Sequence, residues 1–242
     1  MLPVRDHLPT RTFPVINYLL IAANIGAFAL EAMASTDGIR PETLTMTWGL
    51  VPARLFTDPI VGIETIFTSM FMHGGLLHLG GNMLFLWIFG DNVEDALGHL
   101  RYLVFYLLGG LGAAAAQVLV DPGSTIPMVG ASGAISAVLA AYVLLYPQSP
   151  ITVANFSIPI LWLFYGFFML FPAWLVIGLF FVVNLWDALM TQARGGGVAF
   201  MAHVGGFIAG AFLERVFMGG RARMDDYARW QQWGRRRQPG AW

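Results

Sequence analysis

Apolar residues fill most of this chain in long stretches that are separated by short polar segments. A transmembrane helix needs about 20 mainly apolar residues. The pattern contains six such windows and so predicts six membrane-spanning helices: Val15–Ala34, Leu76–Ala96, Arg101–Val120, Val129–Tyr146, Pro172–Met190 and Val198–Met218. We therefore expect an all-α polytopic membrane protein, with the six transmembrane helices bundled in one membrane domain over residues 14–218.

The segments outside these windows differ in character. Residues 1–13 form an N-terminal arm and residues 219–242 a basic tail, both expected in the cytoplasm. Residues 35–75 form a long first loop that we expect to lie on the bilayer. The apolar run between Pro159 and Pro172 is too short to cross a membrane, and prolines break helices. We expect this run to be interfacial or re-entrant.

The composition supports a membrane protein and excludes several kinds of chemistry. Charged residues make up 11% of the chain, against about 25% in soluble domains, which excludes a soluble globular enzyme. Cysteine is absent, which excludes disulfides, thiolate metal sites and cysteine nucleophiles. His73, His78 and Glu94 do not have the spacing of metal ligands. We expect no metal, no cofactor and no nucleic-acid partner.

The arginine distribution predicts the orientation. All thirteen basic residues are arginines, and seven lie in the last 28 residues. Six spans place ten arginines on the side of the termini and three opposite, which favours cytoplasmic termini, as in a bacterial inner membrane. The tail is expected to anchor the topology or to contact anionic lipid headgroups. Residues 1–34 also resemble a signal peptide ending in Ala32-Met33-Ala34, but the apolar run is long for a signal, so we expect a retained span.

Four polar residues within the predicted spans are candidates for function: His78, Asn82, Ser132 and His203. A polar group without a partner is costly in the hydrocarbon core of a membrane, so a polar residue within a transmembrane helix is a candidate for a functional role. His78 and Asn82 are four residues apart and share one helical face. Glu94, later on the same span, is expected to help close it at the cytoplasmic surface.

Ser132 lies at the start of the fourth span, with Gly130 and Gly133 on either side. Small neighbours leave the hydroxyl accessible, and a helix start presents unpaired backbone N–H groups that can bind an anion. Both features suit a serine nucleophile. The same Gly-Ala-Ser-Gly sequence also suits close helix packing without any chemistry.

His203 begins a stripe of small residues, Gly206 and Gly210, on the sixth span. The stripe lets a neighbouring helix approach closely enough for the imidazole to reach one of its groups. A structural histidine bonded to a helix backbone is the alternative. Serine, histidine and a His/Asn pair together supply a nucleophile, a base and oxyanion donors. Neither Asp121 nor Asp187 is obviously aimed at His203, so the pattern indicates a Ser–His dyad.

At these residues the chain resembles the rhomboid family of intramembrane serine proteases. The matching motifs, within residues 14–218, are His73-Gly-Gly-Leu-Leu-His78-Leu-Gly-Gly-Asn82, Gly90-Asp-Asn-Val-Glu94, Gly130-Ala-Ser-Gly133 and Ala202-His-Val-Gly-Gly206. The resemblance implies that Ser132 is the nucleophile and His203 the general base. It implies an oxyanion site of His78, Asn82 and the Ser132 amide, supported by Gly130, and a water-accessible cavity that opens away from the cytoplasm. The first loop departs from the family because it lacks the common Trp-Arg pair.

The resemblance also implies an activity, namely cleavage of transmembrane protein substrates near the membrane–water boundary, among membrane lipids. A helical scissile bond is shielded, so we expect substrates with a helix-breaking Gly or Pro and a small residue at the cleavage position. A non-catalytic binder or chaperone of membrane helices is the alternative function. A transporter using His78, Asn82 and His203 is a third, but no broken-helix pair supports it. Neither alternative requires Ser132. The oligomeric state is left open.

Overall fold

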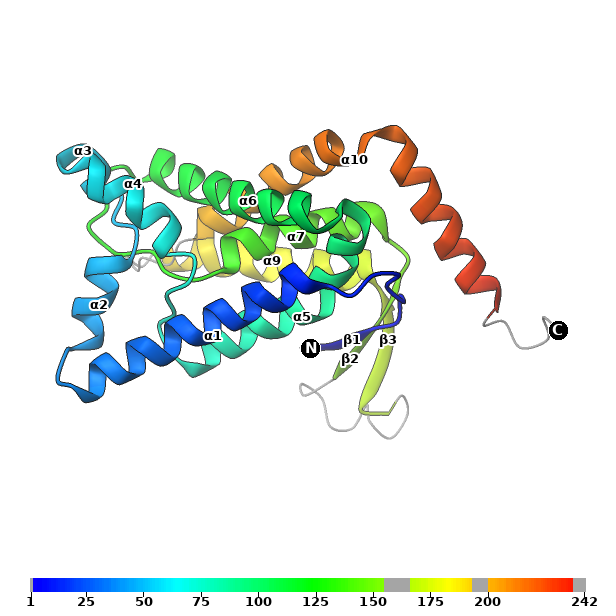
Figure 1. Cartoon of the computed structure of the whole chain (residues 1–242), viewed down its shortest axis with the longest axis horizontal. Helices are drawn as coiled ribbons and strands as arrows, with labels where there is room; N and C mark the ends of the chain where they lie inside the picture. The colour runs from blue at the N-terminus through cyan, green and yellow to red at the C-terminus, as the bar shows by residue number, and fades with distance from the viewer. Residues whose placement is uncertain (1, 155–165, 193–199, 237–242) are drawn as a thin grey trace.

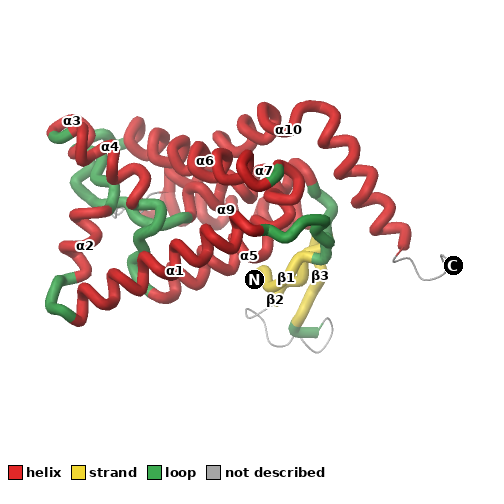
Figure 2. The backbone as a smooth tube through the Cα atoms, viewed as in Figure 1, coloured by secondary structure: helices red, strands yellow, loops and turns green. Residues whose placement is uncertain are grey.

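Helices dominate the structure, and their order follows the predicted spans. The computed structural model describes residues 2–154, 166–192 and 200–236. Within these residues, the long helices, drawn in red in Figure 2, correspond to the six predicted windows: α1 Val15–Thr36, α5 Leu76–Leu97, α6 His99–Val120, α7 Ser132–Leu145, α9 Ala173–Gln192 and α10 Phe200–Arg236. The prediction of a polytopic helical bundle is confirmed.

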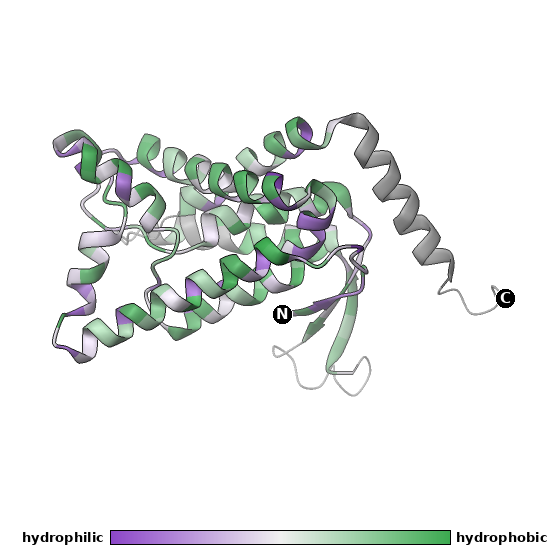
Figure 3. Cartoon of the chain, in the orientation of Figure 1, coloured by the Kyte–Doolittle hydropathy of each residue, from purple (hydrophilic) through white to green (hydrophobic). Residues whose placement is uncertain are grey.

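The apolar composition of these helices, coloured green in Figure 3, makes this an integral membrane protein. Among the described residues, three helices are long and apolar enough to cross a membrane by length and composition alone: Val15–Thr36, His99–Val120 and Phe200–Gly219. α5 is less apolar because it carries His78, Asn82 and three acidic residues near its end. α7 is shorter, with 14 residues.

α7 lies at the centre of the bundle. Most of its side chains are buried, and α5, α6 and α10 pack around it. A Cβ at Gly109 of α6 would lie 2.5 Å from the Cβ of Ala137, and one at Gly210 of α10 would lie 2.4 Å from the Cα of the same residue. Backbones approach this closely only where side chains are small, as is common between membrane helices.

The first loop, predicted over residues 35–75, contains three short helices: α2 Pro41–Trp48, α3 Arg54–Thr57 and α4 Pro59–Thr68. Leu50, between them, forms an isolated antiparallel bridge with Met128, which ties this loop to the segment before α7. Phe56 and Ile60 expose 66% and 83% of their surface. Contact of the loop with the bilayer remains a prediction.

α10 extends past its membrane-length part. The helix continues to Arg236 across a kink at Gly219, whose φ is 54° and ψ is 163°. Most of the tail predicted over residues 219–242 is therefore helical in its backbone. A glycine suits the kink because residues with a Cβ rarely adopt a positive φ.

A small sheet, which the sequence pattern does not predict, lies at the end of the bundle that holds both termini (Figure 1). Its strands pair antiparallel in the order β1 Leu2–Asp6, β2 Pro150–Ala154 and β3 Phe168–Pro172. Part of the arm expected over residues 1–13 is β1, and the end of the run between Pro159 and Pro172 is β3; neither strand is expected from the sequence. Residues 159–165 of that run lie outside the described residues. A short apolar strand has the same local composition as part of a transmembrane helix. The sequence alone therefore does not show that these strands form or which of them pair.

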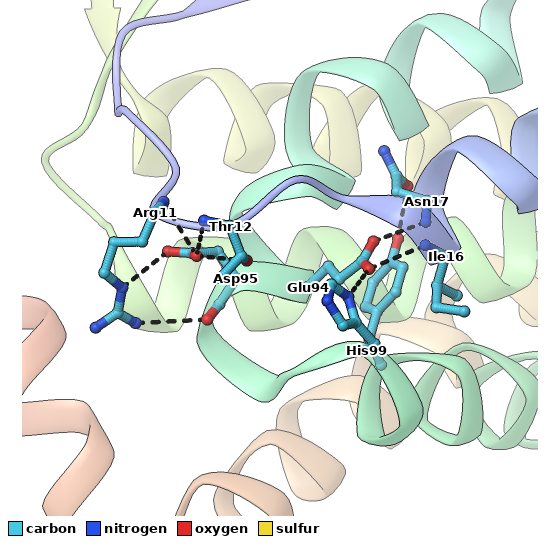
Figure 4. Close-up of polar contacts among 8 residues, drawn as sticks. Arg11, Thr12, Ile16, Asn17, Glu94, Asp95 and His99 are labelled. Atoms are coloured by element: carbon cyan, nitrogen blue, oxygen red, sulfur yellow. Dashed lines mark hydrogen bonds and ion pairs between the residues drawn. The ribbon is translucent and has the colours of Figure 1, made fainter.

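Two acidic residues at the end of α5 anchor the N-terminal part of the chain (Figure 4). The buried carboxylate of Glu94 accepts hydrogen bonds from the backbone N–H groups of Ile16 and Asn17, at 2.9 and 2.7 Å. Asp95 forms an ion pair with Arg11. Because an anion is favourable at a helix N-terminus, Glu94 caps α1 from a neighbouring helix.

Candidate active site

Ser132 of α7 and His203 of α10 meet inside the bundle. His203 Nε2 lies 2.7 Å from Ser132 Oγ, a hydrogen-bonding distance. If the hydroxyl donates, Nε2 accepts and Nδ1 carries the ring proton. Nδ1 has no hydrogen-bond partner among the described residues. Of the two carboxylates considered from the sequence, Asp121 lies exposed at the end of α6, and the side chain of Asp187 lies outside the described part of the structure.

Glycines explain how these two side chains meet. A Cβ at Gly206, one turn after His203, would lie 2.1 Å from the carbonyl oxygen of Gly133. A Cβ at Gly133 would in turn lie 2.5 Å from the Cβ of Ala113 on α6. α10 therefore packs against the backbone of α7 directly beside Ser132. This close approach allows the imidazole of His203 on α10 to reach Ser132 Oγ on α7.

His78 and Asn82 face Gly130 from α5. Gly130 has a φ of 121°, a conformation that favours glycine. A Cβ there would lie 2.7 Å from His78 Nε2 and 3.7 Å from Asn82 Nδ2. Glycine thus leaves open the space that both nitrogens face, two residues before Ser132.

The hydrogen bonds of this pair indicate that both nitrogens are available as donors. The backbone N–H of Gly74 donates to His78 Nδ1 at 3.4 Å, which leaves Nε2 as the protonated ring nitrogen. Asn82 is only 7% exposed, and its Nδ2 has no hydrogen-bond partner in the part of the chain that the structure describes. The N–H groups of Asn82 are therefore available to bind an incoming oxygen. Such binding would remove the cost of leaving a buried amide without a partner.

A cavity of about 190 Å³ gives access to these groups; His78, Gly130, Ser132 and His203 line it together with apolar side chains such as Met70. All the candidate residues except Asn82 therefore line this cavity. Asn82 lies one helical turn after His78 on α5. Residues 2–154, 166–192 and 200–236 hold no group of three or more histidine, aspartate or glutamate residues placed to bind a metal.

α7, which carries Ser132 at its start, is shorter than a membrane-spanning helix. Fourteen residues span about 21 Å, less than the ~30 Å hydrocarbon core. The far end of α7 contacts β1, where Tyr142 donates its hydroxyl proton to Asp6 Oδ2 at 2.9 Å. Val129 and Gly130, which precede α7 in non-helical backbone, line the cavity.

Two residues before α5 support the site, although the sequence pattern did not single them out for a role. The carbonyl oxygen of Ser69 accepts the Gly130 N–H at 2.9 Å. His73 is 2% exposed, and its ring meets that of His78 edge-on with centroids 5.2 Å apart. Burial, with the neighbouring His78, lowers the pKa of His73 to about 4, so this ring is neutral at pH 7. The paired histidines five residues apart are the signal that points to it.

A family comparison agrees with this geometry. A model of the Rhomboid domain matches residues 62–219, more than half of the chain. Rhomboid protein 1, mitochondrial, of Saccharomyces cerevisiae is 24% identical over 214 residues, which cover 85% of this chain and 55% of the yeast protein. RHOMBOID-like protein 5 of Arabidopsis thaliana is 29% identical over 153 residues, 63% of this chain and 43% of that protein.

A human relative gives a similar result. Presenilin-associated rhomboid-like protein, mitochondrial, of Homo sapiens is 29% identical over 137 residues, which cover 55% of this chain and 34% of the human protein. The chain thus spans about half the length, or less, of these curated relatives. The matched domain contains Ser132, His203 and the residues that face Gly130. This chain belongs to the rhomboid family.

Proposed function

We propose that this protein is an intramembrane serine endopeptidase that cleaves transmembrane protein substrates near the membrane–water boundary. The observation that carries the proposal is the 2.7 Å distance between His203 Nε2 and Ser132 Oγ. A hydroxyl hydrogen-bonded to an imidazole can lose its proton as it attacks. The cavity that borders both side chains gives a substrate access to them.

In the proposed reaction, Ser132 Oγ attacks the carbonyl carbon of the scissile peptide, and the hydroxyl proton moves to His203 Nε2. The carbonyl oxygen becomes an anion that N–H groups of His78, Asn82 and Ser132 stabilise. His203 then gives the proton to the leaving amine as the C–N bond breaks. A water molecule, deprotonated by the same imidazole, then attacks the acyl-enzyme; the bond between the acyl carbon and Ser132 Oγ breaks, His203 returns the proton to Oγ, and the second product leaves as a carboxylic acid.

The cavity also supports a restricted substrate class. Its volume of about 190 Å³ suits a small side chain at the cleavage position. A peptide in a helix has its carbonyl hydrogen-bonded, so the substrate must unwind before it reaches Ser132. Gly or Pro near the scissile bond lowers the cost of unwinding.

The proposed placement is a multi-pass protein with cytoplasmic termini in a bacterial inner membrane. The ten-to-three arginine split supports the orientation. The word mitochondrial in the names of two relatives does not fit a bacterial membrane, and the arginine split gives the orientation, not the kind of membrane. Fractionation of cells that express the chain from its own genome would identify the membrane.

A fluorophosphonate probe tests the nucleophile, because it reacts covalently with an activated serine. We expect labelling of Ser132 in the purified full chain, none in Ser132→Ala and strongly reduced labelling in His203→Ala. Ser136→Ala is the matched control. Ser136 lies one turn further along α7, is 4% exposed, and donates its hydroxyl proton to the Ser132 carbonyl at 2.8 Å, so this variant should keep its labelling.

Cleavage of a model transmembrane substrate is the second measurement. Product formation by the wild type and Ser136→Ala, but not by Ser132→Ala, would support the protease. An adduct at another residue, or undiminished labelling in both dyad variants, would refute the dyad. Binding of intact substrate without labelling would favour a non-catalytic binder or chaperone of membrane helices.

A further inference from the structure

Strand β3 carries apolar residues on both of its faces. Phe168 and Leu170 point to one face and are 61% and 63% exposed. Phe171 points to the other face, where it lines an apolar cavity of about 510 Å³ with Phe85 of α5 and Phe180 of α9. An antiparallel sheet with one face in water normally alternates apolar and polar residues along each strand. β3 has no such alternation.

β3 leads directly into a helix that also exposes apolar side chains. α9 begins at Ala173, directly after β3 ends at Pro172. On α9, Trp174 and Val182 are 50% and 60% exposed, as expected for side chains that face lipid. Only Phe171, Pro172 and Ala173 separate Leu170 from Trp174 along the chain.

The direction and sequence of the hairpin agree with an interfacial position. Figure 1 shows β2 and β3 running crosswise to α1 and α5, at the end of the bundle where both termini lie. Figure 3 colours both strands mainly as apolar.

We infer that β3 docks on bilayer lipid, with Phe168 and Leu170 facing the acyl chains of the leaflet next to β1. Only helices and closed barrels span the hydrocarbon core, so a three-stranded sheet in the order β1-β2-β3 belongs at the boundary between headgroups and acyl chains. This inference does not depend on the proposed chemistry at Ser132.

Spin labels test this position, because the chain has no cysteine of its own and a single introduced cysteine is labelled uniquely. The variants are Phe168→Cys and Leu170→Cys, in the full chain reconstituted into vesicles of phosphatidylcholine and phosphatidylglycerol. Val182→Cys on α9 is the lipid control, and Asp121→Cys at the exposed end of α6 is the water control. Collision rates with oxygen and with a water-soluble nickel chelate report the two environments.

We expect both β3 labels to lie between the two controls in oxygen accessibility, as a boundary position requires, and to fall several-fold below Asp121→Cys in nickel accessibility. Nickel accessibility equal to that of Asp121→Cys would overturn the inference and place this face in water. Low accessibility to both reagents would also overturn it, because protein would then cover the face. Dipolar broadening that disappears on dilution with unlabelled chain would identify that protein as a second copy.

Discussion

The hydroxyl group of Tyr102 on α6 donates a hydrogen bond to Asn17 Oδ1 on α1 at 2.8 Å, with both side chains fully buried. Asn17 Nδ2 in turn donates to the carbonyl oxygen of Leu86 on α5 at 3.0 Å. One asparagine therefore links three helices. α5 can approach α1 closely here because Gly90 has no side chain: a Cβ at Gly90 would lie 2.1 Å from Asn17 Oδ1.

Asn17→Ala should lower stability without changing the active site. The substitution removes both hydrogen bonds and leaves the Tyr102 hydroxyl buried without its acceptor, which costs about 1–3 kcal/mol. Thermal unfolding in detergent should show a lower Tm, and kcat per folded molecule should be unchanged because Asn17 is not among the residues that line the cavity at Ser132. An unchanged Tm would mean that water or another group replaces the lost contacts.

Asn82→Ala should have the opposite profile. Because Asn82 Nδ2 has no hydrogen-bond partner among the described residues, its removal breaks no bond made by that atom, and Tm should stay near that of the wild type. Loss of one oxyanion donor typically lowers kcat by about 10²–10³, or 2.7–4 kcal/mol. KM should change little, because the contact forms mainly in the transition state. Steady-state kinetics that show full kcat would remove Asn82 from the oxyanion site.

Gly206→Ala should separate the dyad. The added Cβ would meet the Gly133 carbonyl oxygen at 2.1 Å, so α10 must move away from α7 and carry His203 with it. We expect loss of probe labelling at Ser132 and a lower Tm. Gly178→Ala on α9 is the matched control, since a Cβ there meets no atom within 4 Å. It should preserve labelling and raise helix stability by up to about 1 kcal/mol; equal effects of the two substitutions would contradict the packing argument.

Docking of β1 should weaken as pH rises. Burial, with the nearby Asp91, raises the pKa of Asp6 from 3.8 to about 7. The folded state therefore holds a proton that the unfolded state releases between about pH 4 and pH 7, so stability falls with rising pH across that range. Hydrogen exchange of β1 amides, corrected for intrinsic rates, should show more protection at pH 5 than at pH 8.

Asp6→Asn tests the source of this dependence. The amide can still accept from Tyr142 and Asn92, which both donate to Asp6 Oδ2, but it cannot ionise. Protection of β1 should then be the same at pH 5 and pH 8. If the variant keeps the dependence of the wild type, another group such as Asp91 is responsible.

Reporter fusions test the topology. Six spans put Gly123, in the connection after α6, and Gly219, at the kink in α10, on opposite sides of the membrane. Fusions at these two positions should therefore give opposite signals in a paired assay of periplasmic and cytoplasmic reporters. Matching signals would show that the number of spans between them is even.

The helices could be predicted from sequence because the bilayer imposes a length. The predicted window Val15–Ala34 differs from α1 by two residues at one end, and Arg101–Val120 differs from α6 by two. α7 departs more, since Val129, Gly130 and Ala131 are apolar or small but lie in the non-helical entry to the cavity. Hydropathy alone does not distinguish such a segment from a helix.

The candidate site was predictable only in its parts. Residue type and spacing single out Ser132, His203, His78 and Asn82, and the Gly206 stripe explains a close helix approach. The hydrogen bond between Gly130 N–H and the carbonyl oxygen of Ser69 depends instead on how the first loop packs against the segment before α7, which the Leu50–Met128 bridge joins to it. Such a contact joins residues far apart in the chain and leaves no periodic pattern.

The pairing of Leu2 with Ala154 imposes an order of assembly during synthesis. A ribosome adds about 5–20 residues per second, so roughly 8–30 s separate the appearance of the two strand partners. β1 therefore waits without its partner while α1, α5, α6 and α7 are made and inserted. Contacts between such distant residues form slowly. The sheet therefore forms after these helices have been inserted into the bilayer.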